Sequence, residues 1–382
     1  MHSIYKKKVG VEGNEDRISN LPSCLIGHIL SFLPIKEAVA TGVLSTKWKY
    51  LWTSITNLDF DDKWLLKPIY SQKCTEQKLV MSFVNFVNEV LMRNMPDLHT
   101  FRLGCTWRYS HLNVWISTAL ARNLRELHLF FQRISYHQGL PLEVFTCTSL
   151  IVLELVGGFV LNVPTLVSLQ NLKILLIQGL EFSDDDSIDR LFSGCPLLEE
   201  LSVKRCNYRK IRVFHISAPV LKSLVINCYR EGGYNVFNSY PQGGYKLVLN
   251  TPNLRNLEYN GYVGDAKSYS VDKLNALVNA NIRFVLGDSP DRHYSVEGLV
   301  AEFVEGISKV QRLHFISPSP TVRLCRSPLP KFDHLICLEI GENAEWSLLL
   351  DFLERSQRLE KLIFRISEIV VCPERILDYC GF

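Results

Sequence analysis

The sequence lacks the features that mark most secreted and zinc-binding proteins. Its eleven cysteines are scattered and no two form a Cys-x-x-Cys pair, which disfavours a disulfide framework or a zinc site. No Asn-x-Ser/Thr sequence occurs, and no apolar stretch typical of a secretory signal follows the N-terminal lysines. We therefore expect buried free thiols in a reducing compartment, and an intracellular protein of the nucleus, the cytoplasm or both.

An excess of charge of one sign is also missing. The 42 Lys and Arg residues against 39 Asp and Glu residues give a formal net charge of +3 over 382 residues. A nucleic-acid-binding protein usually has a larger and more clustered basic excess, so no nucleic-acid partner is expected. Apolar residues make up 47% of the chain, which is enough for a large core and excludes wholesale disorder.

An uninterrupted apolar run of membrane-spanning length is absent. Residues 149–169 come closest, but they contain Glu154, Asn162, Pro164 and the Gly157-Gly158 pair. The same stretch fits the repeat pattern described below. We therefore expect neither a membrane span nor a membrane partner.

Sequence motifs of enzymes are missing as well. There is no Gly-x-x-x-x-Gly-Lys-Ser/Thr, no Gly-x-Gly-x-x-Gly after a strand, no His-Glu-x-x-His and no Gly-x-Ser-x-Gly. Three consecutive aspartates, 184–186, follow Ser183 and fit the start of a capped helix better than a metal site, because no further ligand cluster supports them. We expect no catalytic residue, no metal and no cofactor.

The first structured segment of the chain is a compact helical one at residues 16–60, after a polar stretch, 1–15, that we expect to be disordered. Apolar residues at helical spacing place Leu25, Ile26, Ile29, Leu30 and Leu33 on one face of a first helix, which Pro34 ends. Ile35, Ala38, Val39 and Val43 mark a second short helix. A third, with Ser45 or Thr46 as its cap, places Trp48, Leu51 and Trp52 on one face. Three short helices cannot cover this many large apolar side chains. The surplus faces either the rest of the chain, as a cap, or a partner protein.

The sequence of this segment resembles an F-box. The strings that carry the resemblance are Leu21-Pro22, Ile29-Leu30-Ser31-Phe32-Leu33-Pro34, Val43-Leu44-Ser45, Trp48 and Leu51-Trp52. Together with residues 16–22 and Leu58-Asp59-Phe60, they look like the plant F-box/leucine-rich-repeat proteins; Gly42, Ser23-Cys24 and Thr46-Lys47 depart from the usual pattern. The resemblance implies binding to the Skp-type adaptor of a cullin-RING ubiquitin ligase. The side chains to which it assigns adaptor contact, or support of that contact, are Leu21, Pro22, Leu25, Ile29, Leu30, Pro34, Val39, Leu44, Trp48 and Trp52.

From residue 98 onward a six-residue frame, apolar-x-x-apolar-x-apolar, recurs ten times. The frames begin at residues 98, 124, 150, 172, 198, 221, 254, 310, 335 and 359. A period of about 20–29 residues is that of leucine-rich repeats. One interval, of 56 residues, equals two periods, and Ile282-Val285 stands where the missing unit belongs. We therefore expect an α/β fold: a three-helix F-box followed by a leucine-rich-repeat solenoid, a curved parallel sheet with helical returns.

The repeats also set the predicted organisation of the chain. We assign 61–330 to the solenoid, and 331–382 to final repeats with a partial region that resembles the FBD region of the same plant proteins. Residues 65–97 form a return helix behind a first strand at 58–60, which joins the F-box to the solenoid without a flexible linker. Residues 229–248 and 286–295 are predicted to be inserted loops.

Each frame also predicts which side chain points away from the core. The residue between the last two apolar positions faces outward on the concave face of the sheet. The row is Arg102, His128, Glu154, Leu176, Ser202, Val225, Glu258, His314, Glu339 and Ile363. Its mixed chemistry suits a protein or peptide surface better than a nucleic acid. The candidate substrate-binding residues are its polar members: Arg102, His128, Glu154, Ser202, Glu258, His314 and Glu339.

These patterns together predict a non-catalytic substrate-recognition subunit of a Skp-cullin-F-box ubiquitin ligase. Its F-box binds the Skp-type adaptor, and its repeats bind an unidentified protein substrate. Two alternatives stay open. One is a scaffold whose F-box-like end has weakened or only caps the solenoid, and the other is a small-molecule receptor or an enzyme with a pocket inside the solenoid.

Overall fold

The computed structural model describes residues 18, 20–63, 76–93, 97–107, 109–136, 139–228, 244–262, 266–272, 274–285, 296–316, 329–341 and 346–365. The predicted disordered segment 1–15 and the predicted loop 286–295 lie outside these residues.

The N-terminal end of the molecule consists of short helical segments. They are α1 (Ser23–Leu30), α2 (Ile35–Ala40) and the 3₁₀ segments η1 (Thr41–Val43) and η2 (Trp48–Ser54). Pro22 and Pro34 immediately precede the two α-helices. Proline is tolerated at a helix start because the backbone N–H that it lacks would have no hydrogen-bond partner within the helix. The prediction that Ser45 or Thr46 caps the third helix is wrong. That helix is a 3₁₀ turn beginning at Trp48, and no side chain caps it; such tight turns are common in short connecting pieces.

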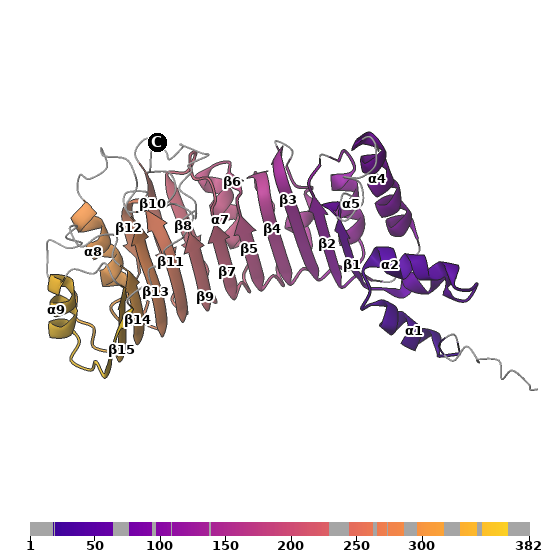
Figure 1. Cartoon of the computed structure of the whole chain (residues 1–382). Helices are drawn as coiled ribbons and strands as arrows, with labels where there is room; N and C mark the ends of the chain where they lie inside the picture. The colour runs from indigo at the N-terminus through magenta and orange to yellow at the C-terminus, as the bar shows by residue number, and fades with distance from the viewer. Residues whose placement is uncertain are drawn as a thin grey trace, which may run out of the picture.

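One long parallel sheet runs through the rest of the molecule (Figure 1). Its strands follow the chain order, and the short β6 (Glu181–Phe182) pairs with β4 beside the main path. The strands of the main path are β1 (Asn57–Asp61), β2 (Thr100–Cys105), β3 (Glu126–Tyr136), β4 (Val152–Leu161), β5 (Ile174–Gln178), β7 (Glu200–Lys204), β9 (Ser223–Asn227), β11 (Asn256–Tyr262), β13 (Asn279–Val285), β14 (Arg312–Ile316), β15 (Cys337–Gly341) and β16 (Lys361–Arg365). Each predicted frame coincides with one of these strands.

The frame residues fill the interior of the solenoid, as predicted. In the nine frames from residue 98 to residue 340 all three apolar positions are buried. The tenth frame differs, because Leu362 and Phe364 of β16 are 36% and 51% exposed. In the described part of the chain no strand pairs with the far side of β16, and no described unit covers this frame.

The unit missing from the repeat pattern is β13, and its frame is Leu277-Ala280-Ile282. All three residues are buried, whereas Val285 is only half-buried. The prediction that the missing unit lies at Ile282-Val285 is confirmed, since both residues belong to β13. The alanine at the middle position interrupts the pattern of large apolar residues that marks the other frames.

The connections between strands are only partly helical. The helical returns are α4 (Glu76–Met92), α5 (Leu112–Leu120), α6 (Glu143–Thr146), α7 (Asp185–Ser193), α8 (Val296–Gly306) and α9 (Trp346–Arg355). Between β7 and β13 the returns are instead strands, β8 (Val213–Ser217), β10 (Tyr245–Asn250) and β12 (Ala266–Val271), which form a second parallel sheet. Buried residues alternate along β8 and β10, which is the period of a strand. The predicted loop 229–248 is thus strand from residue 245, and residues 229–243 lie outside the described part.

The helical end and the sheet share one hydrophobic core, which runs from Ile26 to Phe352. Strand β1 begins directly after η2, and the Thr56 carbonyl oxygen accepts hydrogen bonds from the backbone N–H groups of His99 and Thr100 at 2.8 and 3.3 Å. Helix α4 follows β1 as its return, as predicted. No helix in the described residues is long and apolar enough to cross a membrane, and residues 152–161 of the apolar stretch form β4.

Candidate functional site

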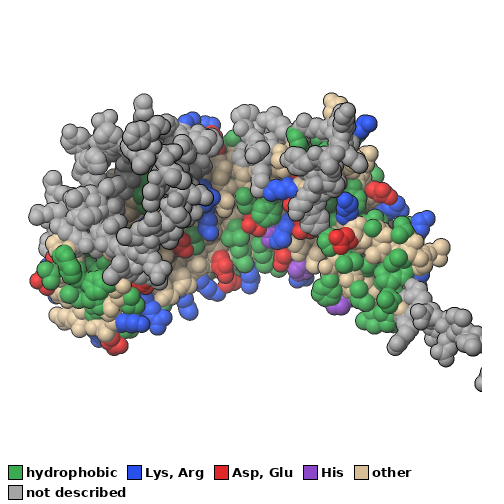
Figure 2. All heavy atoms as spheres, viewed as in Figure 1, with side chains coloured by type: hydrophobic (Ala, Val, Ile, Leu, Met, Phe, Trp, Pro, Cys, Tyr) green, Lys and Arg blue, Asp and Glu red, His purple; other side chains and the backbone are tan. Residues whose placement is uncertain are grey.

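The helical N-terminal end carries an exposed apolar surface, visible as green side chains at the lower right of Figure 2, where Figure 1 shows α1 and α2. Six large side chains on α1, on η1 and next to them are between 37% and 88% exposed. They are Leu25, Ile29, Phe32, Leu33, Val43 and Leu44. Apolar side chains grouped in this way on a soluble surface mark a protein interaction site.

Helix α1 divides its apolar residues between two rows. Ile26 and Leu30 are fully buried, whereas Leu25 and Ile29 are 48% and 45% exposed. The prediction that all of them share one face is therefore wrong. Each pair is four residues apart, and the two rows are offset by about 100° around the helix axis, so one row packs inward while the other remains outside.

The ten predicted adaptor-binding residues fall into three groups. Pro22, Leu25, Ile29 and Leu44 are exposed, while Leu21, Pro34 and Val39 are half-buried. Leu30, Trp48 and Trp52 are 0%, 6% and 3% exposed, so they support the surface from within rather than form it. Sequence reasoning did not single out Phe32, Leu33 and Val43 as contacts, although all three stand in the strings that carry the resemblance.

Tight packing holds this surface in place. Helix α1 packs closely against η2: a Cβ atom added at Gly27 would lie 2.6 Å from Ser54 Oγ, so a larger residue there would require the Ser54 side chain to move. Lys47 Nζ donates to the Leu21 carbonyl oxygen at 3.0 Å, and Trp52 Nε1 donates to the Lys49 carbonyl oxygen at 3.1 Å. The exposed side chains therefore stand on a braced support.

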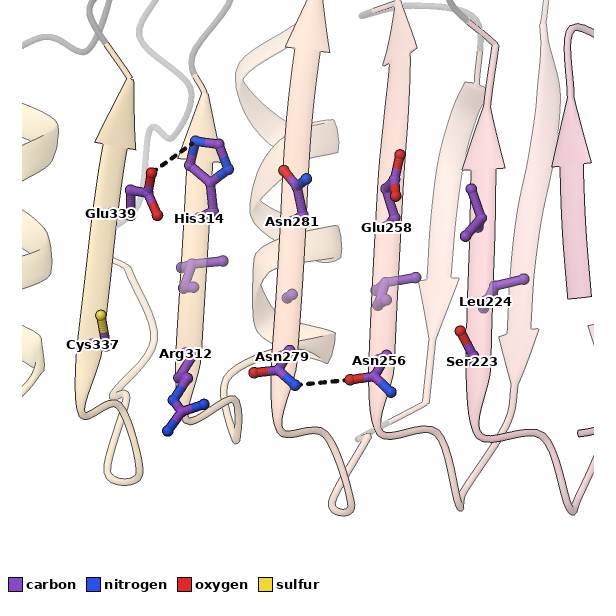
Figure 3. Close-up of a pocket in the computed structure, with 14 residues that line it drawn as sticks. Ser223, Leu224, Asn256, Glu258, Asn279, Asn281, Arg312, His314, Cys337 and Glu339 are labelled. Carbon is purple, nitrogen blue, oxygen red and sulfur yellow. Dashed lines mark hydrogen bonds and ion pairs between the residues drawn. The ribbon is translucent and has the colours of Figure 1, made fainter. Parts of the chain in front are cut away.

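The predicted outward row exists as one line of neighbouring residues across the sheet. The register pairs its members strand by strand, and it adds Asp59 at the β1 end and Asn281 on β13. The line lies on the face opposite the frame residues, which we call the open face. Figure 3 shows its C-terminal part, with the row residues Glu258, Asn281, His314 and Glu339 labelled on neighbouring strands.

In the N-terminal half of the open face, the row residues interact with one another. His128 Nδ1 lies 2.7 Å from Glu154 Oε2, and His128 Nε2 lies 3.7 Å from Glu126 Oε2. Arg102 lies 4.0 Å from Asp59 and stacks over the Phe130 ring at 5.9 Å. Burial raises the pKa of the Asp59 carboxyl, although Arg102 acts in the opposite direction.

Two predicted contact residues are covered by their neighbours. His128 is 8% exposed and Ser202 is 9% exposed, so neither is the solvent-facing residue that the strand pattern predicts. Side chains on adjacent strands stand about 5 Å away and shield short or paired groups between them.

In the C-terminal half of the open face lies a shallow pocket of about 380 Å³ across β9, β11, β13, β14 and β15. It brings together three predicted residues, Glu258, His314 and Glu339, with His314 Nε2 3.9 Å from Glu339 Oε1. Arg102, His128 and Glu154 form a separate group over β2 to β4, and Ser202 lies between the two groups. The sequence analysis missed five polar residues of the pocket lining: Ser223, Asn256, Asn279, Asn281 and Arg312.

Comparison with known proteins identifies the family of this chain. Residues 18–59 match the F-box domain, and residues 112–259 match the leucine-rich repeats described for the FBD-associated F-box protein At5g56370. The chain is 32% identical over 357 residues to the F-box/FBD/LRR-repeat protein At2g04230 of Arabidopsis thaliana, which covers 91% of this chain and 74% of that protein. The chain belongs to the plant F-box/FBD/LRR-repeat family.

Other relatives in this family match nearly the whole chain. The F-box/LRR-repeat protein At4g14103 of the same plant is 32% identical over 93% of either chain. The F-box/LRR-repeat protein At3g59200 is 33% identical over 92% of this chain and 69% of its own length. The matches therefore extend over the F-box and the repeats together.

The described part of this F-box/LRR-repeat protein contains no group of three or more His, Cys, Asp and Glu side chains that could hold a metal ion. Asp184 caps α7, and Asp185 accepts hydrogen bonds from the backbone of Arg212 and Val213. The seven described cysteines are free thiols, and burial raises the pKa of Cys195 to about 12. Cys24 is exposed on α1, contrary to the expectation that the thiols are buried.

Proposed function

We propose that this chain is a non-catalytic substrate-recognition subunit of a Skp-cullin-F-box ubiquitin ligase inside the cell, in the nucleus, the cytoplasm or both. Its F-box binds the Skp-type adaptor through α1, η1 and the residues next to them. Its repeats bind a protein substrate on the open face. The contribution to catalysis is proximity, because the complex holds a substrate lysine near ubiquitin carried by another subunit.

The observation that carries the proposal is the exposed apolar surface of the F-box. Leu25, Ile29 and Leu44 are 48%, 45% and 66% exposed, on a support made by buried Leu30, Trp48 and Trp52. A segment that served only as a cap for the solenoid would turn its large apolar side chains inward, since leaving them in water has a free-energy cost. Aliphatic anchors on a packed support are typical of a protein interface.

The substrate side of the proposal is supported by the chemistry of the open face. Acidic, basic and amide side chains alternate along it with apolar ones such as Val225 and Leu176. Such a mixture is typical of surfaces that recognise proteins.

The test is co-purification of the full chain with a Skp-type adaptor. We expect the double variant Leu25→Ser, Ile29→Ser to weaken adaptor binding about 100-fold or more, since interface anchors each contribute about 2 kcal/mol or more. Both side chains are about half exposed, so the substitutions leave the F-box core intact.

The matched control is Val114→Ser on α5, a substitution of a residue that is 62% exposed but lies outside the F-box. This variant should bind the adaptor like the native chain. A native chain that is folded but fails to bind any Skp-type adaptor would overturn the proposal in favour of a scaffold.

A further inference from the structure

The open face over β9, β11 and β13 has a composition that strands normally avoid. Asparagine is depleted in strands because its short polar side chain favours turns. Nevertheless, five of the eleven outward positions on these three strands are asparagine. The eleven positions are Ser223, Val225, Asn227, Asn256, Glu258, Asn260, Tyr262, Asn279, Asn281, Arg283 and Val285. So many asparagines at one place in a sheet, against their normal depletion in strands, indicate a functional constraint.

The backbone of these strands is not available to a ligand. Strand β9 pairs with β7 and β11, β11 pairs with β9 and β13, and β13 pairs with β11 and β14. Their N–H and C=O groups are therefore consumed within the sheet. A partner cannot add as a further strand here, so it must be recognised by side chains alone.

The asparagine side chains present the groups that a peptide backbone requires. A carboxamide has two N–H donors and an acceptor oxygen, which complement the C=O and N–H of a peptide group. Asn279 Nδ2 donates to Asn256 Oδ1 at 2.8 Å, which orients both side chains and still leaves each amide further hydrogen-bonding capacity (Figure 3). Asn260, two residues beyond Glu258 on β11, continues the same outward line past the residues that line the pocket.

A carboxylate lies at the centre of this group. Glu258 is half-buried in the pocket, and the register places it beside Asn281. No described Lys, Arg or His side chain lies within ion-pair distance of Glu258, whereas the other pocket carboxylate, Glu339, lies near His314. The arginines of the neighbouring strands, Arg283 and Arg312, are exposed at the margins. A cationic group of a ligand is thus the complement that the centre of the pocket lacks.

We propose that Asn256, Asn260, Asn279, Asn281 and Glu258, here called the amide cluster, bind an extended segment of the substrate protein. The carboxamides pair with its peptide groups, and Glu258 pairs with a Lys or Arg side chain. The pocket, about 380 Å³, lies within the range of about 300–1,000 Å³ typical of ligand pockets. This inference rests on the proposed function only in assigning the segment to the substrate of a ligase.

The test uses the immobilised full chain and pools of nonapeptides. The central residue is fixed as Arg, Gln or Glu, and all other positions are randomised. We expect the Arg pool to be retained about fivefold more than the Gln pool, the effect of one partly exposed ion pair of about 1 kcal/mol, and the Glu pool least of all. Glu258→Gln should abolish the preference for Arg. The double variant Asn256→Ala, Asn281→Ala should reduce retention of all three pools, because it removes contacts to the peptide backbone.

The matched control is Glu143→Gln on α6, an exposed carboxylate outside the pocket, which should keep the native preference. Equal retention of the Arg and Gln pools by the native chain, or a preference that survives Glu258→Gln, would refute the amide cluster as a peptide site. Adaptor binding is measured on the same preparations. A chain that binds adaptor but no pool loses this inference alone, and one that binds pools but no adaptor loses only the ligase function.

Discussion

Asp184 determines where α7 begins. Its Oδ1 accepts the Ser187 backbone N–H at 2.6 Å, and its Oδ2 accepts the Ser183 hydroxyl at 2.8 Å. Arg190 Nη2 lies 3.5 Å from the same carboxylate. Partial burial alone would raise the pKa of this carboxyl, but the hydrogen bonds from Ser183 and Ser187, together with Arg190, hold it below the ordinary 3.8. The charged form is therefore the one that the folded state favours.

A substitution series at Asp184 separates the cap from the charge. Asp184→Ala should lower the free energy of unfolding by about 1 kcal/mol near neutral pH, whereas Asp184→Asn keeps a cap acceptor and should cost less. Because the folded-state pKa is lowered, the contribution of the charge is present above pH 3.8 and is lost as the pH falls through the folded-state value. Urea unfolding should therefore show the wild type and Asp184→Asn converging in stability as the pH falls below 3.8. A gap that is constant with pH would contradict this assignment.

At the same scale, the sequence predicts the direction of a side chain better than its exposure. Alternation along each strand places Glu258 and Glu339 outward without knowledge of the neighbouring strands. The burial of His128 depends on Glu126 and Glu154, one on its own strand and one 26 residues away on the next. Such cross-strand cover is a property of the assembled sheet, and no local pattern encodes it.

At the scale of elements, the predictable strands are those whose frames carry large apolar residues. The position of β13 was predicted, but its frame was not, because Ala280 fills a position that Leu257 and Leu313 fill on the neighbouring strands. Its outward residues Asn279 and Asn281, two of the five residues of the amide cluster, were therefore not predicted. The strand returns β8 and β10 were not predicted, although apolar residues alternate in both, because most leucine-rich units of this chain return through helices.

The junction of β3 and β4 depends on one glycine. Gly157 has a φ of +127°, and a Cβ atom there would lie 2.0 Å from the Phe131 carbonyl oxygen, where the register between the two strands shifts. Gly157→Ala should therefore lower the free energy of unfolding by about 1–3 kcal/mol or more. Gly139→Ala is the matched control, since nothing lies within 4 Å of its added Cβ. Thermal unfolding compares the two, and equal melting temperatures would contradict the assignment.

At the scale of the whole molecule, the F-box and the repeats are parts of one continuous core. Trp52 and Ile55 of the F-box end belong to the same hydrophobic cluster as Leu58 and Phe60 of β1. In a stacked array each unit contacts its immediate neighbours, so a local loss of packing should spread over one or two units and then fade.

Hydrogen exchange can measure how far such a loss extends. Trp52→Ala should cost about 3–5 kcal/mol locally and accelerate amide exchange in α1, α2, β1 and β2, with β14 and β15 unchanged. Phe352→Ala at the far end, also fully buried, should produce the reverse distribution. Uniform acceleration along the chain in both variants would mean that the molecule unfolds as a single cooperative unit.

Because the strands of the sheet follow the chain order, the number of strands between two sites determines the distance between them. Seven strand steps separate β1, next to the F-box, from β11 at the amide cluster, or roughly 34 Å at about 4.8 Å per step. Under the proposed function, this distance between the F-box and the amide cluster determines which substrate lysine is presented to ubiquitin. Inserting one repeat would shift the bound segment by about 5 Å, or about one and a half residues of an extended chain. Relatives that differ in repeat number would then modify different lysines of the same protein, without any change at the binding residues.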